Sequence, residues 1–233
     1  MTTAAERAQA VSTMFTRIAR RYDLMNSLMT AGRHHAWRGA AAREAAGAPP
    51  GPLLDLATGT ADLALAAKRL DPARMVIGVD FSLGMLAQAR RKLDARGVRV
   101  GLAAADALAL PFADGAFASV VSAFLLRNLV DLEAGLAEMR RVTRRGGRVI
   151  ALDIVKIARP PWDALFGVYF HRVVPAMGTL VAGDHQAYSY LPDSVDRFLT
   201  AADVAAAMRR AGLRDVSVRT FGLGSVALHA GVA

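Results

Sequence analysis

Apolar residues along this chain form short unbroken runs, separated by longer segments in which they recur every three to four positions. The short runs predict buried strands, which we expect at residues 53–57, 75–80, 98–103, 116–124 and 148–154. The periodic segments predict helices, which we expect at residues 62–70, 85–95 and 132–142. Gly146-Gly147 would stop the last of these helices. Strands that alternate with helices in this way are typical of an α/β fold with a parallel sheet.

The two ends of the chain depart from this alternation. Residues 5–20 and 24–29 have helical spacing, and Pro49-Pro50-Gly51-Pro52 then breaks the chain. We therefore expect a helical cap over residues 1–48 and a main domain over residues 49–233. Within the main domain, an apolar helical insertion occupies residues 160–200 approximately.

The last part of the chain predicts a helix at residues 201–211 and strands near 215–220 and 225–229. The turn Gly222-Leu223-Gly224 between these strands is so short that they must be antiparallel. The expected fold is thus Rossmann-like: a mostly parallel seven-stranded sheet with one antiparallel strand and helices on both faces.

Composition narrows the function classes. The 233 residues carry a net charge of +9 and no cysteine, which excludes disulfides and thiolate chemistry. The positive charge favours acidic partners such as nucleic acid or anionic lipid, although solvated arginine-rich helix faces explain it equally well. The N-terminus has no apolar signal core, so we expect a cytoplasmic protein. The five histidines show no HxxxH spacing, so we expect no metal site.

The segment that begins at Leu53 carries the first candidate chemistry. A strand is followed by an acid-containing turn of small residues, and Asp80 lies at the end of the next strand, 21 residues after Gly59. A carboxylate there can accept both ribose hydroxyls of an adenosine cofactor. The NAD fingerprint needs three glycines, and the residues at these positions are Gly59, Ala61 and Ala64. Asp55 also opposes NAD, because its carboxylate would repel a pyrophosphate. A cationic cofactor is favoured instead.

Two later features agree with a sulfonium cofactor. Asp106-Ala107 follows the third expected strand, where a carboxylate can receive the adenine amino group. Pro111-Phe112 leads into the buried fourth strand. Ligands in this fold bind where the parallel strands end, and three acids lie at the ends of successive strands. The sequence therefore predicts S-adenosylmethionine as the cofactor.

The order of motifs resembles class I methyltransferases and, more closely, the ubiquinone/menaquinone C-methyltransferase family of the UbiE type. The motifs that carry the resemblance are Tyr22-Asp23-Leu24-Met25-Asn26, His34 with Trp37-Arg38, the segment from Asp106 to Phe112, Arg127-Asn128, Tyr190-Leu191-Pro192 and Val226-Ala227-Leu228-His229. The chain departs from the family pattern at Ala61, Ala123, Leu125, Arg145 and Asp153. These changes leave the cofactor site intact and bear on the identity of the substrate.

The resemblance implies C-methylation of a prenylated quinol, a lipophilic small molecule. Arg127, Asn128 and Tyr22 would line the catalytic site. The residues expected to bind the cofactor are Asp55, Ala57, Gly59, Thr60, Asp80, Phe81, Asp106, Ala107, Ser122 and Ala123. The resemblance is also compatible with a homodimer and with transient contact at the inner face of the membrane, and we expect no nucleic-acid partner.

Alternatives remain open at this point. The same cofactor domain would serve a phospholipid head-group or secondary-metabolite methyltransferase, or a non-catalytic S-adenosylmethionine-binding protein. Without the resemblance, Arg127-Asn128 would be read as a helix N-cap with a surface ion pair. Trp162, Phe166, Tyr169 and Phe170 suit either a tunnel for a prenyl tail or ordinary core packing. The proton acceptor is undetermined, with His185 beside Asp184 as one candidate.

Overall fold

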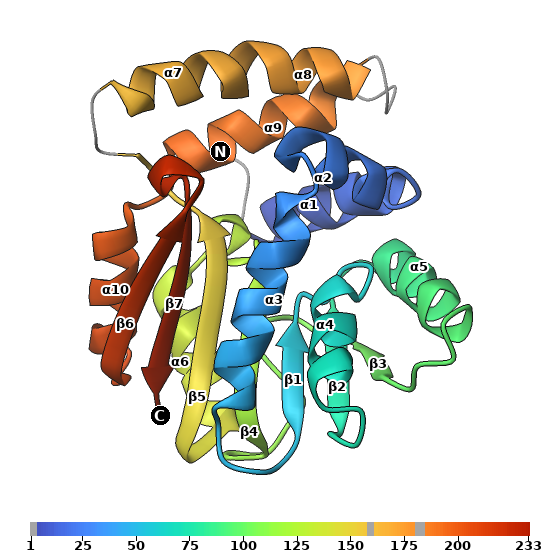
Figure 1. Ribbon diagram of the computed structural model, residues 1–233, viewed down its shortest axis with the longest axis vertical. Coiled ribbons are helices and arrows are strands. Elements are labelled where there is room, and N and C mark those ends of the chain that lie inside the picture. Colours follow the sequence, from blue (N-terminus) through green and yellow to red (C-terminus); the bar gives the residue numbers. More distant parts are fainter. Residues whose placement is uncertain (1–3, 158–160, 180–184) are drawn as a thin grey trace.

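The computed structural model describes residues 4–157, 161–179 and 185–233, and its centre is one seven-stranded sheet (Figure 1). The strands lie in the order β3-β2-β1-β4-β5-β7-β6. Their bounds are Leu53–Leu56 (β1), Val76–Asp80 (β2), Gly101–Ala104 (β3), Phe117–Ala123 (β4), Thr143–Ile154 (β5), Arg214–Phe221 (β6) and Val226–Val232 (β7). β7 runs antiparallel to both of its neighbours, and the other pairings are parallel. The expected sheet is confirmed.

Helices cover both faces of the sheet. One face packs against α3 (Arg33–Ala46), α4 (Asp62–Leu70) and α5 (Leu83–Asp94), and the other against α6 (Leu132–Val142) and α10 (Ala201–Arg210). Alternate residues of one strand contribute to the two cores: Leu53 faces the α3 side, whereas Leu54 faces the α6 side. β1 is buried at every position, as expected for a central parallel strand.

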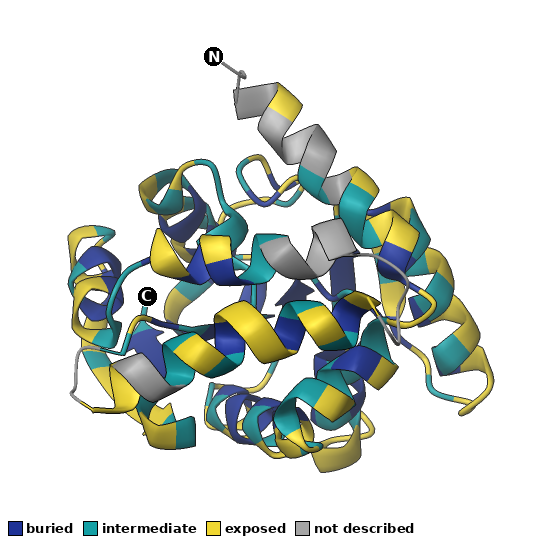
Figure 2. Cartoon of the chain, turned by 90° about the horizontal axis from the view of Figure 1, so that it is seen from above, coloured by how far each residue is buried: buried dark blue, intermediate teal, exposed yellow. Residues whose placement is uncertain are grey.

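A third group of helices lies beyond the carboxyl ends of the parallel strands, at the top of Figure 1. It contains α1 (Ala4–Ile18) and α2 (Tyr22–Thr30) from the N-terminus. The insertion adds α7 (Trp162–Val168), a π-helical turn (Tyr169–Val173), α8 (Val174–Met177) and α9 (His185–Asp196). Figure 2 looks down on these helices, and the parts of them that it colours include both buried and exposed positions. They therefore cover the sheet edge at which ligands bind in this fold.

Two expectations need correction. Gly146-Gly147 does not stop a helix: α6 ends at Val142, and both glycines lie inside β5. The backbone requires them there, because Gly146 has φ +73° and a Cβ on Gly147 would approach the Ala118 carbonyl oxygen to 2.7 Å. In addition, α3 forms a separate helix within the expected cap, and its alanines are buried in the core beside the sheet. The expected insertion at residues 160–200 approximately includes residues 180–184, which lie outside the described part of the chain.

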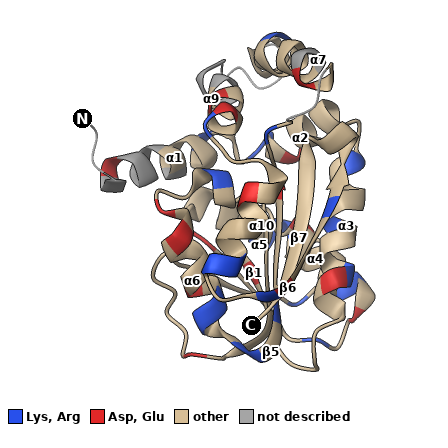
Figure 3. Cartoon of the chain, turned by 90° about the vertical axis from the view of Figure 1, so that its left-hand side faces the viewer, with Lys and Arg blue, Asp and Glu red and all other residues tan. Residues whose placement is uncertain are grey.

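Charge and hydrophobicity add two facts about the surface. In the view of Figure 3, basic positions are spread over several helices and loops and do not gather on one element. Within the described residues, no helix is both long enough and apolar enough to cross a membrane.

Candidate functional site

The loop after β1 has an unusual backbone. Ala57, Gly59 and Ala61 all have positive φ, at +56°, +56° and +67°. A Cβ on Gly59 would meet nothing within 4 Å, so this position faces open space, and its φ favours glycine. Ala61 is the N-cap of α4 and is fully buried. Small residues here let the backbone itself form the wall of a cavity.

Asp80, at the end of β2, joins this loop to the next one. Its Oδ2 accepts a hydrogen bond from the Gly59 N–H at 2.8 Å, and its Oδ1 accepts one from the Ser82 N–H at 2.8 Å. Burial raises the pKa of Asp80, although the backbone N–H groups of Ser82, Gly59 and Phe81 act in the opposite direction. A carboxylate has about four lone-pair sites, so these three donors leave room for another. Asp80 can therefore accept a further hydrogen bond from a ligand.

A cavity of about 330 Å³, here called the strand-end cavity, opens beside Asp80. Loops that follow β1, β2, β3 and β4 form most of its wall, and α1 contributes Val11 and Phe15. Seven of the ten residues expected to bind the cofactor line it: Ala57, Gly59, Asp80, Phe81, Asp106, Ala107 and Ala123. Ser82, Met85 and Leu125 also line it and were not expected.

The other three expected residues, Asp55, Thr60 and Ser122, are buried behind the residues that line this cavity. Asp55 is 1% exposed, and its Oδ2 accepts hydrogen bonds from Thr58 Oγ1 at 2.7 Å and the Ala64 N–H at 3.0 Å. Burial raises the pKa of Asp55 to about 7. Among the described atoms, Asp55 Oδ1 and Ser122 Oγ have no hydrogen-bond partner. Thr60 is buried and bonds to the cap instead.

A second cavity of about 410 Å³, here called the cap cavity, lies between the N-terminal helices and the insertion. Met14, Ile18, Trp37, Phe166, Phe170 and Leu191 make much of its wall apolar. Phe166 and Phe170 stack at 4.6 Å, and Tyr169 donates a hydrogen bond to the Met29 carbonyl at 2.6 Å, which joins the insertion to α2. Three of the four aromatic residues singled out in the insertion thus line this cavity. Trp162 is 38% exposed.

Arg127 lines the cap cavity and forms a buried ion pair. Its Nη1 lies 2.5 Å from Asp153 Oδ1, and the two side chains are 5% and 2% exposed. Nη1 also donates to the Phe124 carbonyl at 2.9 Å. The alternative of a surface ion pair with an N-cap is wrong, because the partner is buried and Asp131 caps α6. Asp153 was noted in the sequence only as a departure from the family pattern.

Asn128 and Tyr22 connect the two cavities. Asn128 lines the strand-end cavity, and Tyr190 lines the cap cavity. Tyr190 Oη donates a hydrogen bond to Asn128 Oδ1 at 3.1 Å. Asn128 Nδ2 donates to the Phe124 carbonyl at 3.0 Å. Tyr22 lines both cavities, as do Phe15 and Phe124. The three residues expected to be catalytic therefore lie where the cavities adjoin.

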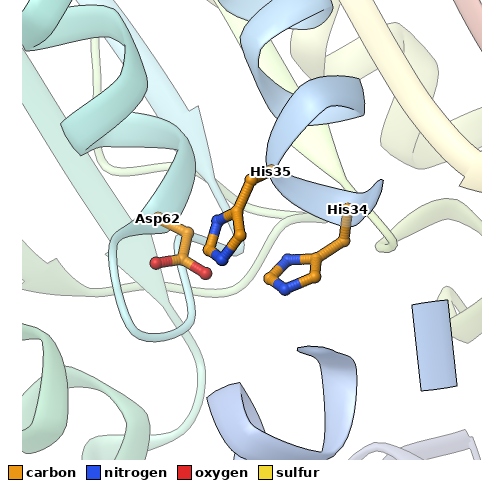
Figure 4. A group of neighbouring side chains, drawn as sticks. All are labelled: His34, His35 and Asp62. Atoms are coloured by element: carbon orange, nitrogen blue, oxygen red, sulfur yellow. The ribbon is translucent and has the colours of Figure 1, made fainter. Parts of the chain in front are cut away.

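His34, His35 and Asp62 point toward one another, with possible ligand atoms within 4.8 Å (Figure 4). The neighbours of this cluster oppose a metal ion. His34 Nδ1 accepts a hydrogen bond from Arg38 Nη1 at 2.5 Å, and Lys92 Nζ lies 2.8 Å from Asp62 Oδ1. Burial, aided by the Arg38 charge, lowers the pKa of His34 to about 4. Two cations beside the cluster make it an unfavourable place for a third.

A polar network ties the cap to the loop after β1. Thr60 Oγ1 donates to Asp23 Oδ1 at 2.6 Å, and Lys92 donates to Thr60 Oγ1 at 2.8 Å. Lys92 also forms ion pairs with Asp23 and Asp62. This network, called the cap latch below, holds α2 against the strand-end cavity. Nothing in the spacing of Asp23, Thr60 and Lys92 along the chain predicts it. His185 begins α9, but its side chain lies outside the described part of the chain.

Comparisons with known proteins identify the family of the chain. The family model of the ubiE/COQ5 methyltransferase family matches residues 1–233. A demethylmenaquinone methyltransferase of Thermus thermophilus is 44% identical over 218 residues, which cover 94% of this chain and 99% of that relative. A ubiquinone/menaquinone biosynthesis C-methyltransferase UbiE of Desulfotalea psychrophila is 40% identical, with coverages of 95% and 89%.

A solved structure supports the fold separately. A SAM-dependent methyltransferase from Thermotoga maritima, described as a possible histamine N-methyltransferase, superposes with a TM-score of 0.67 at 18% identity. The match covers 95% of this chain and 99% of that one, and at this identity it bears on the fold alone. The fold and the family expected from the sequence are both confirmed. The chain belongs to the ubiE/COQ5 methyltransferase family.

Proposed function

We propose that this methyltransferase transfers a methyl group from S-adenosylmethionine to a ring carbon of a prenylated quinol, a demethylmenaquinol or ubiquinol precursor. The observation that carries the proposal is the pair of adjoining cavities. Both have largely apolar walls, but one adds the carboxylates of Asp80 and Asp106 and the other adds the Arg127 guanidinium, and they share Tyr22 and Phe124. The relatives named for quinone methylation match almost the whole chain.

The strand-end cavity fits S-adenosylmethionine, which supplies an electrophilic methyl group on a sulfonium sulfur. Asp80 would accept a hydrogen bond from the ribose hydroxyls, and the open space at Gly59 would admit the ligand close to the backbone. Phe81, Met85 and Ala107 offer apolar contacts to adenine, and Asp106 a hydrogen-bond acceptor. Asp55, Thr60 and Ser122 would act on the cofactor from behind this wall.

The cap cavity fits a prenylated ring. Its apolar wall would hold the tail, and Tyr22, which lines both cavities, lies where the ring would meet the cofactor. Arg127 stays protonated and is neutralised by Asp153, so it would orient the ring hydroxyl by hydrogen bonding and would not remove a proton. Asn128 and Tyr22 would complete the site. Alignment of two bound reactants alone can lower the barrier by about 7–11 kcal/mol.

Transient contact with the inner face of the membrane belongs to the same proposal. Leu24 and Leu28 on α2 are 53% and 44% exposed, and Val168 and Val173 of the insertion are also exposed. Arg20 and Arg21 beside α2 are exposed cations that suit anionic head groups. A prenylated substrate would then enter the cap cavity from the lipid phase. A cytoplasmic location, a homodimer and a cap limited to residues 1–48 stay predictions.

Two variants test whether the strand-end cavity binds the cofactor and the cap cavity binds the acceptor. Asp80→Ala should weaken S-adenosylmethionine binding at least about ten-fold, because a buried charged hydrogen-bond acceptor is lost. Arg127→Ala should leave cofactor binding within a few-fold and abolish transfer to demethylmenaquinol. Binding is measured by calorimetry and transfer by mass spectrometry. Unchanged cofactor affinity in Asp80→Ala would remove the cofactor assignment, and continued methylation by Arg127→Ala would remove the acceptor site.

A further inference from the structure

Phe124 lies in the wall that the two cavities share. Its side chain lines both of them, as do those of Phe15 and Tyr22. Phe15 and Tyr22 come from α1 and α2 and pack edge to face, with centroids 6.0 Å apart. Phe124 directly follows β4, so the shared wall combines aromatic rings from the cap and from the edge of the sheet. In a transfer between the two cavities, this wall decides how the reactants approach each other.

The backbone of Phe124 is strained. Its φ is +64°, a conformation that is rare for a bulky side chain and costs free energy. Several contacts hold it there. The Phe124 N–H donates to the Leu152 carbonyl at 2.7 Å, and the Phe124 carbonyl accepts from Arg127 Nη1 at 2.9 Å and Asn128 Nδ2 at 3.0 Å. Strain that is held by its surroundings in this way is characteristic of functional sites.

Two guanidinium groups fix the ring. Arg38 Cζ lies 5.0 Å from the ring centroid and Arg127 Cζ lies 5.7 Å from it. Arg38 is 5% exposed, and so is the Arg127 side chain. Attraction between a cation and an aromatic ring is strongest when water is excluded from both. Both the backbone and the ring of Phe124 are therefore held in one place before any ligand binds.

We propose that Phe124 aligns the two reactants, with its ring setting the orientation in which the acceptor ring faces the sulfonium methyl group. This inference rests on the proposed function. Arg127 and Asn128 then act partly as positioning residues, through the Phe124 carbonyl. In the transfer, a ring carbon forms a bond to the methyl carbon, the carbon–sulfur bond breaks with its electron pair on sulfur, and the ring proton passes to solvent water. Phe124 takes no part in these bond changes.

Four variants of the full chain test the inference. Phe124→Leu removes the ring, Phe124→Gly removes the ring and relieves the strained φ, and Phe124→Tyr keeps the ring. Phe112→Leu is the matched control, because Phe112 is also half-buried, packs edge to face on Phe117 at 4.9 Å, and lies outside the described walls of both cavities. For each we would measure kcat and KM with demethylmenaquinol, cofactor affinity by calorimetry, and the melting temperature.

Misalignment by about 1 Å can cost about 100-fold in rate, so kcat should fall by about that factor in Phe124→Leu and Phe124→Gly. Cofactor affinity should stay within a few-fold, and Phe124→Tyr and Phe112→Leu should keep most of the wild-type kcat. The glycine variant keeps the test valid if Phe124→Leu does not fold. Wild-type kcat in Phe124→Gly would overturn the inference. A loss of rate that disappears at saturating cofactor concentration would also overturn it. An inactive wild type would instead overturn the proposed function, and the inference with it.

Discussion

The two cavities are built in different ways. The strand-end cavity is lined mainly by consecutive short loops at the ends of β1 to β4, and its key hydrogen bonds run between backbone N–H groups and Asp80. The cap cavity collects side chains from α1, α2, α3, the insertion and the turn before β7. The wall of the strand-end cavity is thus set mainly by the edge of the sheet, whereas that of the cap cavity depends more on packing between helices. This difference suits a family in which one cofactor serves different acceptors.

The largest expected effect concerns the buried ion pair beneath the cap cavity. Arg127→Met should lower the free energy of unfolding by about 3–5 kcal/mol, because Asp153 would keep an uncompensated buried charge. The double variant Arg127→Met/Asp153→Leu should recover much of this loss. Chemical denaturation measures both.

The exposed pair of Arg210 and Glu133, with side chains 59% and 55% exposed, is the control for that experiment. Arg210→Met should cost less than about 1 kcal/mol. Equal losses in Arg127→Met and Arg210→Met would contradict the buried pairing.

The second expected effect is a pH dependence of stability, to which Asp55 in β1 and His34 beside the cap cavity contribute with opposite signs. Asp55 holds its proton up to about pH 7 in the folded state, against an ordinary pKa of 3.8, so its contribution to stability falls as pH rises between these values. His34 has a folded pKa of about 4, against 6.5, so its contribution rises with pH across that window. In the wild type the two trends partly cancel.

Variants separate the two trends. Asp55→Asn should leave a free energy of unfolding that rises from pH 4 to 6.5, and His34→Gln one that falls over the same range. The change across the window should be on the order of a few kcal/mol, from about 1.4 kcal/mol for each pKa unit. Parallel curves for wild type and Asp55→Asn would show that Asp55 is ionised in the fold.

A smaller effect is expected from the cap latch, which joins α2 to the loop after β1. Lys92 is 14% exposed, Asp62 13% and Asp23 40%, so the pairing is partly screened. Lys92→Met should cost about 1 kcal/mol or less and should speed amide hydrogen exchange in α2. Exchange in α10, which lies on the other face of the sheet, serves as the internal control. Unchanged exchange in α2 would show that the latch does not hold the cap.

The smallest effect concerns the loop after β1. Ala61 has φ +67°, so Ala61→Gly should raise the free energy of unfolding, by less than about 1 kcal/mol. Ala67→Gly, in the same helix at an ordinary helical position, should lower it by about 1 kcal/mol. Thermal denaturation gives both changes. A loss of stability in Ala61→Gly would mean that the buried Cβ outweighs the strain.

The strand-end cavity was largely predictable because polar residues at the ends of successive parallel strands must come together at one edge of the sheet. This logic predicts that Asp80 and Asp106 lie at the same sheet edge as Gly59, and all three line the strand-end cavity. It fails for Asp55, because the sequence does not say that its carboxylate accepts the N–H of Ala64 inside α4. It also fails for Thr60, whose hydroxyl donates a hydrogen bond to Asp23 of the cap.

The cap cavity was less predictable. Arg127 pairs with Asp153, 26 positions away, and Tyr190 bonds to Asn128, 62 positions away. No periodicity links such residues, since tertiary packing alone brings them together. Sequence motifs named Tyr22, Arg127 and Asn128 only through resemblance to a family. The strain at Phe124 has no signal in the sequence at all, because phenylalanine rarely adopts positive φ.

The central claim is that the cap cavity binds a quinol whose ring carbon receives the methyl group. The direct test supplies S-adenosylmethionine with a deuterated methyl group to wild-type protein with demethylmenaquinol, a ubiquinol precursor or phosphatidylethanolamine. Mass spectrometry and NMR then locate the label. We predict a labelled methyl group on a ring carbon of a quinol and none on the phospholipid. Label on an oxygen, or on phosphatidylethanolamine in place of the quinols, would contradict the account.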